Sequence, residues 1–108
     1  MNFESKILSR EISQLLWERE ETLSTAESCT GGRVAEAIIS IPGASKYYKG
    51  SVVSYVNEIK ESLLGVDHDL LIEKGAVSEE VAIEMVKGAC KVLNTTYAIS
   101  ITGFAGPG

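Results

Sequence analysis

The sequence is poor in the residues that mark disulfide-rich, metal-binding or membrane proteins. Its 108 residues include 2 cysteines and 1 histidine, too few for a disulfide framework or a cluster of metal ligands. No run approaches the roughly 18 apolar residues of a membrane span, and the first residues lack the basic and apolar regions of a secretory signal. The sequence therefore predicts a cytoplasmic chain with reduced cysteines, no bound metal and no membrane partner.

Positive charge is also scarce. The 10 lysines and arginines are outnumbered by 15 aspartates and glutamates, which gives a net charge of -5, and an acidic protein is poorly suited to neutralise the phosphates of a nucleic acid. With 44% hydrophobic residues and only 2 prolines, the composition is that of one ordinary globular domain. The expected partner is therefore a small metabolite and not a nucleic acid.

Hydrophobic periodicity alternates between helix and strand along the chain. It predicts an amphipathic helix that ends near residue 20, strands at 22–26, 51–56 and 97–101, and helices that follow the first strand, span 57–64 and begin after Ser78. An irregular stretch is expected before Ser78, and Met85 and Cys90 are expected to pack in the core. This alternation predicts an α/β fold, a three-layer sandwich with a mostly parallel sheet and helices on both faces.

The most informative segment is TAESCTGG at residues 25–32, where the first strand passes into a helix. Such a junction presents backbone N–H groups and the positive end of a helix dipole, which favour an anion such as phosphate. A polar helix cap with a tight turn is the alternative. The same position also suits Ser28 or Cys29 as a nucleophile. Because ligands of parallel sheets bind at the carboxyl ends of strands, the loops with Ser28, Tyr55 and Thr102 are expected to converge.

Four segments occur in order along nearly the whole chain: AESCTGG at 26–32, YVNEIK at 55–60, GAVS at 75–78 and TGFAGPG at 102–108. In this combination the sequence closely resembles the CinA C-terminal domain family, whose characterised members are nicotinamide-nucleotide amidases. The resemblance implies a single CinA C-terminal-like domain over residues 1–108. It also implies hydrolysis of nicotinamide mononucleotide to nicotinic acid mononucleotide and ammonia, in pyridine nucleotide recycling, with no cofactor and with a pyridine nucleotide as the partner.

The same resemblance implies roles for individual residues. The family is understood as a serine amidohydrolase with a Ser/Lys pair, and by motif the nucleophile position falls on Ser45, the base on Lys60 and a supporting group that orients the pair on Tyr55. The implied substrate-binding positions are Ser28, Cys29, Thr30, Gly31, Gly32, Thr102 and Gly103. Ser28 is then part of the binding wall and not the attacking group.

The chemistry of amide hydrolysis is consistent with such a pair. A hydroxyl needs a nearby base to attack an amide, and the tetrahedral oxyanion needs preorganised donors, here backbone N–H groups near Gly103 or around Ala44 and Ser45. A lysine can act as a base only when neutral, which requires burial or a cationic neighbour to lower its pKa. From the residues alone, Lys60 would ordinarily be solvated and Ser45 would ordinarily be a turn residue.

One departure from the family concerns the end of the chain. Family members continue past the Gly-Pro-Gly motif with further strands and a terminal helix, which hold an arginine implicated in the active site, whereas this sequence stops at Gly108. The fold is therefore expected to be truncated at its C-terminus, with an exposed edge that favours association, for example as a homodimer. Two other functions stay open: a non-catalytic nucleotide-binding or regulatory module, inactive because truncated, and a structural oligomerisation domain suggested by the first helix and Trp17.

Overall fold

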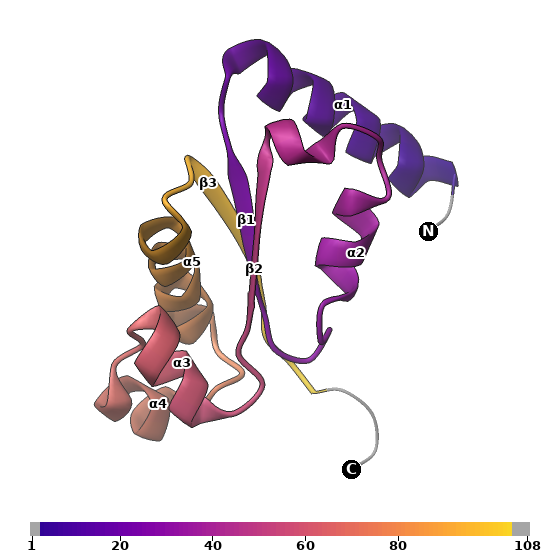
Figure 1. Cartoon of the computed structure of the whole chain (residues 1–108). Helices are drawn as coiled ribbons and strands as arrows, with labels where there is room; N and C mark the ends of the chain where they lie inside the picture. Colours follow the sequence, from indigo (N-terminus) through magenta and orange to yellow (C-terminus); the bar gives the residue numbers. More distant parts are fainter. Residues whose placement is uncertain (1–2, 105–108) are drawn as a thin grey trace.

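The computed structural model describes residues 3–104, with the backbone alone for residues 3–6. Its three strands form one parallel sheet in the order β2-β1-β3, where β1 is Leu23–Glu27, β2 is Tyr48–Val53 and β3 is Tyr97–Ile101. On one side of the sheet lie α1 (Phe3–Arg19) and α2 (Arg33–Ile39), and on the other lie α3 (Asn57–Leu64), α4 (His68–Lys74) and α5 (Glu79–Leu93) (Figure 1). The predicted α/β sandwich with a parallel sheet and helices on both faces is confirmed.

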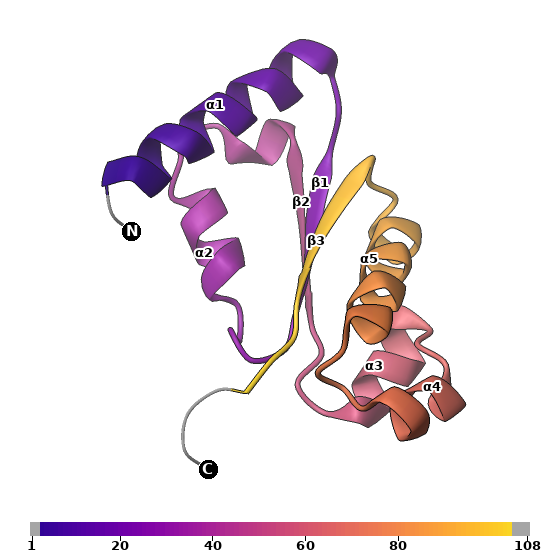
Figure 2. The same ribbon diagram turned by 180° about the vertical axis from the view of Figure 1, so that it is seen from behind.

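The central strand β1 is buried along its whole length, because it is paired on both edges and covered on both faces. Its polar residues are tolerated because each has a hydrogen-bond partner. The hydroxyl of Ser24 lies 2.8 Å from that of Thr95, and the hydroxyl of Thr25 lies 2.7 Å from that of Tyr48. All three strands run in the same direction, so the loops that leave them emerge at one edge of the sheet (Figure 2).

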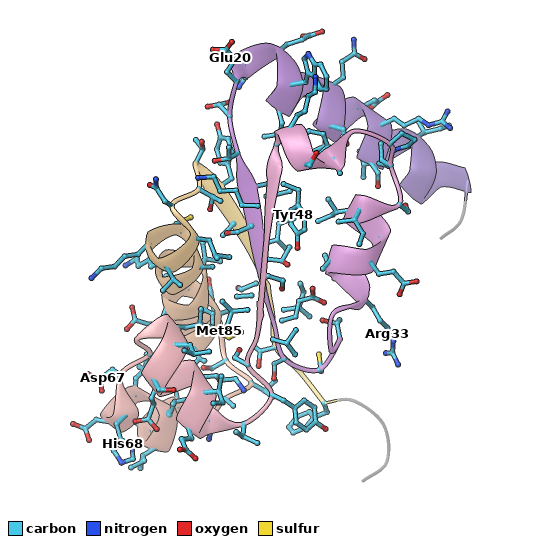
Figure 3. The ribbon with its side chains drawn as sticks, viewed as in Figure 1. Glu20, Arg33, Tyr48, Asp67, His68 and Met85 are labelled. Carbon is cyan, nitrogen blue, oxygen red and sulfur yellow. The ribbon has the colours of Figure 1, made fainter. Side chains whose placement is uncertain are left out.

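The main core lies between the sheet and α5. Met85 is fully buried at its centre and projects from α5 toward the sheet (Figure 3), as expected, while Cys90 is only partly buried. The buried residues of this core are Ala26, Val52, Leu64, Val66, Leu71, Val81, Met85 and Ala89. They join α3, α4 and α5 to the sheet as one layer.

The layer on the opposite side covers the sheet less completely. Its small core consists of Leu16, Leu23, Ala44, Tyr47 and Tyr48. On α1 the side chains of Ile12 and Leu15 are 44% and 50% exposed, and on β3 those of Tyr97 and Ile99 are 45% and 43% exposed. These four residues line a shallow apolar depression of about 240 Å³ between α1 and β3. The amphipathic helix forms where predicted, but part of its apolar stripe faces solvent.

Two elements differ from the sequence prediction. Strand β2 begins at Tyr48 and ends at Val53, earlier at both ends than predicted, and its register with β1 shifts beside Gly50, which has a φ of 147°. Helix α4 forms in the stretch expected to be irregular, because the carboxylate of Asp67 caps its first turn by accepting from Asp69 N at 2.8 Å and Leu70 N at 3.1 Å. Of the helices in the described part of the chain, none is long and apolar enough to cross a membrane.

Candidate active site

The loops that follow the three strands meet at the carboxyl edge of the sheet, as expected. Ser28, the first residue after β1, donates its backbone N–H to the carbonyl of Ile101 at the end of β3, 2.9 Å away. Ser54, the first residue after β2, donates its N–H to the carbonyl of Glu27 at 2.7 Å. After β3, Gly103 lies so close to Cys29 that a Cβ at Gly103 would be 3.4 Å from the Cys29 sulfur.

Lys60 is the most unusual residue at this edge. It lies on α3 with only 1% of its surface exposed, although lysines are almost never fully buried without partners. Its ammonium nitrogen Nζ lies 2.9 Å from the carbonyl oxygen of Ser54, 3.2 Å from that of Tyr55 and 3.1 Å from the hydroxyl oxygen of Ser28. The buried nitrogen therefore has two carbonyl acceptors and one hydroxyl neighbour.

The burial of Lys60 shifts its protonation equilibrium toward the neutral form. Burial lowers the pKa of its amino group below the ordinary lysine value, and the negative charge of a Cys29 thiolate opposes this shift. A neutral amine has two hydrogens and one lone pair, and here the two carbonyls can accept the two hydrogens. The lone pair is then left for the hydroxyl hydrogen of Ser28, so this geometry suits a base that removes a proton from Ser28.

The structure does not bring Ser45 and Lys60 of this chain together, unlike the pair implied by the resemblance. Ser45 is exposed in a short 3-10 turn, Ala44–Lys46, that precedes β2 and lies beside α1 at the upper end of the sheet in Figure 1. Lys60 follows β2, so the 6 residues of this strand separate the two sites by roughly 20 Å at about 3.3 Å per residue. For the same reason the N–H groups of Ala44 and Ser45 cannot serve as oxyanion donors beside Lys60.

Tyr55 also differs from its expected role. Its backbone carbonyl accepts the hydrogen bond from Lys60, but its side chain is 65% exposed. Its hydroxyl makes no hydrogen bond within the described part of the chain. Tyr55 therefore orients Lys60 through its backbone and not through its side chain.

The expected anion site at the start of α2 is filled by the protein itself. The carboxylate of Glu27 accepts hydrogen bonds from the backbone N–H groups of Gly32 at 3.1 Å, Val34 at 3.0 Å and Ala35 at 2.9 Å, and from the hydroxyl of Thr30 at 2.7 Å. These are the groups that would have received a phosphate. The expectation that this turn holds a ligand anion with the helix N-terminus is therefore corrected, and the alternative of a helix cap is favoured.

Glu27 is a residue of the candidate site that the sequence interpretation missed. Burial alone would raise the pKa of its carboxyl group, but the hydrogen bonds from Thr30, Val34, Ala35 and Gly32 outweigh this effect and hold the pKa below its ordinary value. The signal in the sequence was an acidic residue at the end of a buried strand, since a buried carboxylate requires strong partners. A glycine-rich turn directly after it supplies such partners as backbone N–H groups.

The other predicted substrate-binding positions divide into two groups. Ser28, Cys29 and Gly103 lie at the Lys60 site, whereas the hydroxyl of Thr102 donates to the carbonyl of Ala76 at 2.8 Å and that of Thr30 is bound by Glu27. Gly31 and Gly32 have φ values of 58° and 105°, so they shape the turn. Arg33, directly after it, points away from the protein (Figure 3). Residues 105–108 of the closing motif lie outside the described residues.

Two backbone donors beside Ser28 stay unused. Within residues 3–104, the N–H groups of Cys29 and Thr30 form no hydrogen bond, whereas Gly31 N bonds to Ser28 O at 3.2 Å and Arg33 N to Thr30 O at 3.1 Å. Unused N–H groups that directly follow a hydroxyl are the kind of donor that can stabilise an oxyanion. Among the described side chains, no three His, Cys, Asp or Glu residues gather as they would around a metal ion.

Comparison with solved structures supports the fold. The crystal structure of the competence/damage inducible protein CihA from Agrobacterium tumefaciens matches with a TM-score of 0.96 and 37% sequence identity, covering 100% of this chain and 66% of that one. A CinA superfamily protein from Escherichia coli matches with a TM-score of 0.92 and 36% identity, covering 99% of this chain and 63% of that one. This chain thus spans about two thirds of those structures.

Comparison with curated proteins gives the same answer. A CinA-like protein of Cyanothece sp. is 52% identical over 101 residues, which are 94% of this chain and 24% of the relative. A CinA-like protein of Endomicrobium trichonymphae is 50% identical over 105 residues, which are 97% of this chain and 24% of the relative. The sequence model of the CinA C-terminal domain family matches residues 5–108 of this chain. The chain therefore belongs to the CinA C-terminal domain family.

Proposed function

We propose that this chain carries the reacting pair of an amidohydrolase that converts nicotinamide mononucleotide to nicotinic acid mononucleotide and ammonia. The observation that carries the proposal is the buried amino group of Lys60, 3.1 Å from the hydroxyl of Ser28 and bound, among the described residues, otherwise only by the carbonyls of Ser54 and Tyr55. The choice of substrate follows from the resemblance to the family. The nucleophile in this proposal is Ser28 and no longer Ser45.

In the first half of the reaction, neutral Lys60 accepts the hydroxyl proton of Ser28, and the Ser28 oxygen forms a bond to the carboxamide carbon. The tetrahedral intermediate collapses when Lys60 returns the proton to the amide nitrogen, so the carbon–nitrogen bond breaks and ammonia leaves. An ester between Ser28 and the nicotinoyl group results. The positive pyridinium ring of the substrate would further disfavour a protonated Lys60 and so keep the base ready.

In the second half, water replaces ammonia. Lys60 accepts a proton from the water, the resulting oxygen attacks the ester carbon, and the bond to Ser28 breaks as the proton returns to its oxygen. The negative oxygen of both tetrahedral intermediates needs donors, and the unused N–H groups of Cys29 and Thr30 are the ones this proposal assigns to it. No residue beyond these four is asked to touch the reacting atoms.

The test is ammonia release from nicotinamide mononucleotide, measured for this chain and for a longer form extended to the length of its relatives. In whichever form is active, Ser28→Ala and Lys60→Met should lower turnover by at least about 1,000-fold, in line with the loss of a nucleophile or its base. Ser45→Ala is the matched control, because it removes an exposed hydroxyl at the opposite end of the sheet, and it should leave turnover unchanged.

Three outcomes decide between the proposals. Loss of turnover in Ser45→Ala but not in Ser28→Ala would return the nucleophile to Ser45. Normal turnover in both would mean that neither serine attacks the amide. Binding of the nucleotide without ammonia release in both the short and the long form would favour the non-catalytic binding module.

A further inference from the structure

Glu27 stands out among the described residues as a buried carboxylate with six hydrogen-bond donors and no cation among them. One carboxylate oxygen accepts from the hydroxyl of Thr30 at 2.7 Å and from the N–H groups of Gly32 and Val34 at 3.1 and 3.0 Å. The other accepts from Ala35 N at 2.9 Å and from the hydroxyls of Thr25 and Ser51, both at 3.3 Å. Glu27 is fully buried. The mechanism above assigns it no step.

These donors come from three parts of the chain that surround the nucleophile. Thr25 lies on β1 and Ser51 on β2, while the other four belong to the turn after Ser28 and the first residues of α2. The carboxylate therefore ties the turn to both strands at once. A neutral side chain of the same size could not accept from all six donors, because an amide replaces one acceptor oxygen by a donor.

The backbone of Glu27 is connected to the base as well. Its carbonyl accepts from the N–H of Ser54 at 2.7 Å and from the Ser54 hydroxyl at 3.4 Å, and the carbonyl of Ser54 in turn accepts from Lys60 at 2.9 Å. One residue thus lies between the two members of the pair: its side chain holds the turn that follows Ser28, and its carbonyl holds the segment that binds Lys60.

We propose that Glu27 is the positioning residue of this site, whose carboxylate acts as an internal anion that folds the Ser28 turn onto α2 and so aims the Ser28 hydroxyl at Lys60. The inference rests on the proposed function only in that Ser28 is the reacting hydroxyl. Glu27 does not touch the substrate. Its effect should therefore be on the rate of the chemical step and not on substrate binding.

The first test replaces Glu27 by glutamine and uses as the matched control Glu36→Gln, at an exposed glutamate in the first turn of α2. Glu27→Gln should lower kcat by about 100-fold, the loss that follows a misplacement of about 1 Å, with KM unchanged within about twofold, because uniform binding is untouched. Glu36→Gln should leave both parameters unchanged.

The second test is chemical rescue, which stays informative if Glu27→Gln folds poorly. Glu27→Ala leaves a buried space lined by the six donors, and formate is a carboxylate small enough to enter it. Added formate should raise the thermal midpoint and restore part of the kcat of Glu27→Ala, and it should change neither in the wild type. A glutamine variant with wild-type kcat, or a folded Glu27→Ala on which formate has no effect, would overturn the role of the carboxylate.

A fluorophosphonate probe separates this inference from the proposed function. The Ser28 oxygen would form a bond to phosphorus, fluoride would leave, and Lys60 would accept the hydroxyl proton, with no amide substrate involved. Labelling that is lost in Ser28→Ala and slowed in Glu27→Gln supports the positioning role even if no ammonia is released from nicotinamide mononucleotide. Equal labelling of the wild type and Glu27→Gln contradicts it, whatever the substrate.

Discussion

Gly88→Ala is expected to separate two helices and thereby disable the reacting pair. Gly88 is buried on α5 where this helix crosses the end of α3. A Cβ at this position would lie 2.0 Å from the carbonyl oxygen of Leu64 and 2.8 and 2.9 Å from its carbonyl carbon and Cα. All three atoms belong to the backbone, so no side-chain rotation can relieve the contact, and α3 and α5 must move apart by at least about 1 Å.

The magnitude follows from two opposed effects on the free energy of unfolding. Overpacking a core costs about 1–3 kcal/mol, and a contact with backbone belongs at the upper end of that range. The higher helix propensity of alanine returns about 1 kcal/mol. The net loss is about 2 kcal/mol, which for a domain of this length lowers the melting temperature by about 10 °C.

The same movement should reach the active site, because Lys60 lies on α3, four residues before Leu64. A shift of about 1 Å would break the 3.1 Å contact between Lys60 and Ser28 and lower kcat by about 100-fold. The matched control is Gly65→Ala at the end of α3, where φ is 70° but nothing lies within 4 Å of a Cβ. It should cost about 1 kcal/mol of strain without lowering kcat.

Thermal unfolding followed by circular dichroism, together with ammonia release at a temperature where every variant is folded, measures both effects. If Gly88→Ala melts at or above the wild-type temperature, the close contact between α3 and α5 is not present in solution. If it is destabilised but retains full kcat, the position of α3 does not control Lys60, and the link between this contact and the site is refuted.

Three further predictions concern the site and the core. Because only neutral Lys60 can accept a proton, kcat/KM should rise with pH through the pKa of Lys60, which lies below the ordinary value of about 10.4. Cys29→Ser should move this rise to lower pH, because it removes the thiolate charge that opposes the lowering of the Lys60 pKa. A pH–rate profile that is the same in Cys29→Ser and the wild type would contradict the assignment. Met85→Ala should lower the free energy of unfolding by about 2–5 kcal/mol in urea titrations, whereas Ile83→Ala, 47% exposed on the same helix, should cost far less. Ser78→Ala should cost about 1 kcal/mol by removing the acceptor of Val81 N at 3.3 Å, a loss that thermal unfolding would detect.

Local chemistry explains why some elements could be predicted accurately from the sequence. The end of α3 is determined by Gly65, which adopts the left-handed conformation at its C-cap, and the start of α5 by the Ser78 hydroxyl. The start of β2 could not be predicted in this way. Tyr48 is a strand residue because it pairs with Leu23 on β1, and its hydroxyl reaches Thr25, 23 positions away; periodicity within β2 reveals neither partner.

The place of the candidate site could be predicted from the sequence, but the hydroxyl that lies beside Lys60 could not. Parallel strands bring the loops of Ser28 and Lys60 to one edge, and this was expected from the alternation of helices and strands. The motif comparison placed the attacking hydroxyl on Ser45, which precedes β2 while Lys60 follows it. Residues that come just before and just after a strand in the sequence lie at opposite ends of that strand, so the topology already argued against that pair. The burial of Lys60 depends on its contacts with Ser28 and could not be inferred from its own helix.

The hydrogen bonds of Lys60 have a consequence for the order in which the site assembles. Its two carbonyl partners, Ser54 and Tyr55, lie 6 and 5 positions before it in the sequence, so this part closes as a short loop at small entropic cost. Ser28 is 32 positions away and arrives when β1 pairs with β2 through the crossover that contains α2. Both members of the proposed pair therefore lie within one β-α-β unit and the helix after it. Substitutions in α1, α4 and α5 would change the stability of the fold that holds Ser28 beside Lys60, but they would not change the two residues themselves.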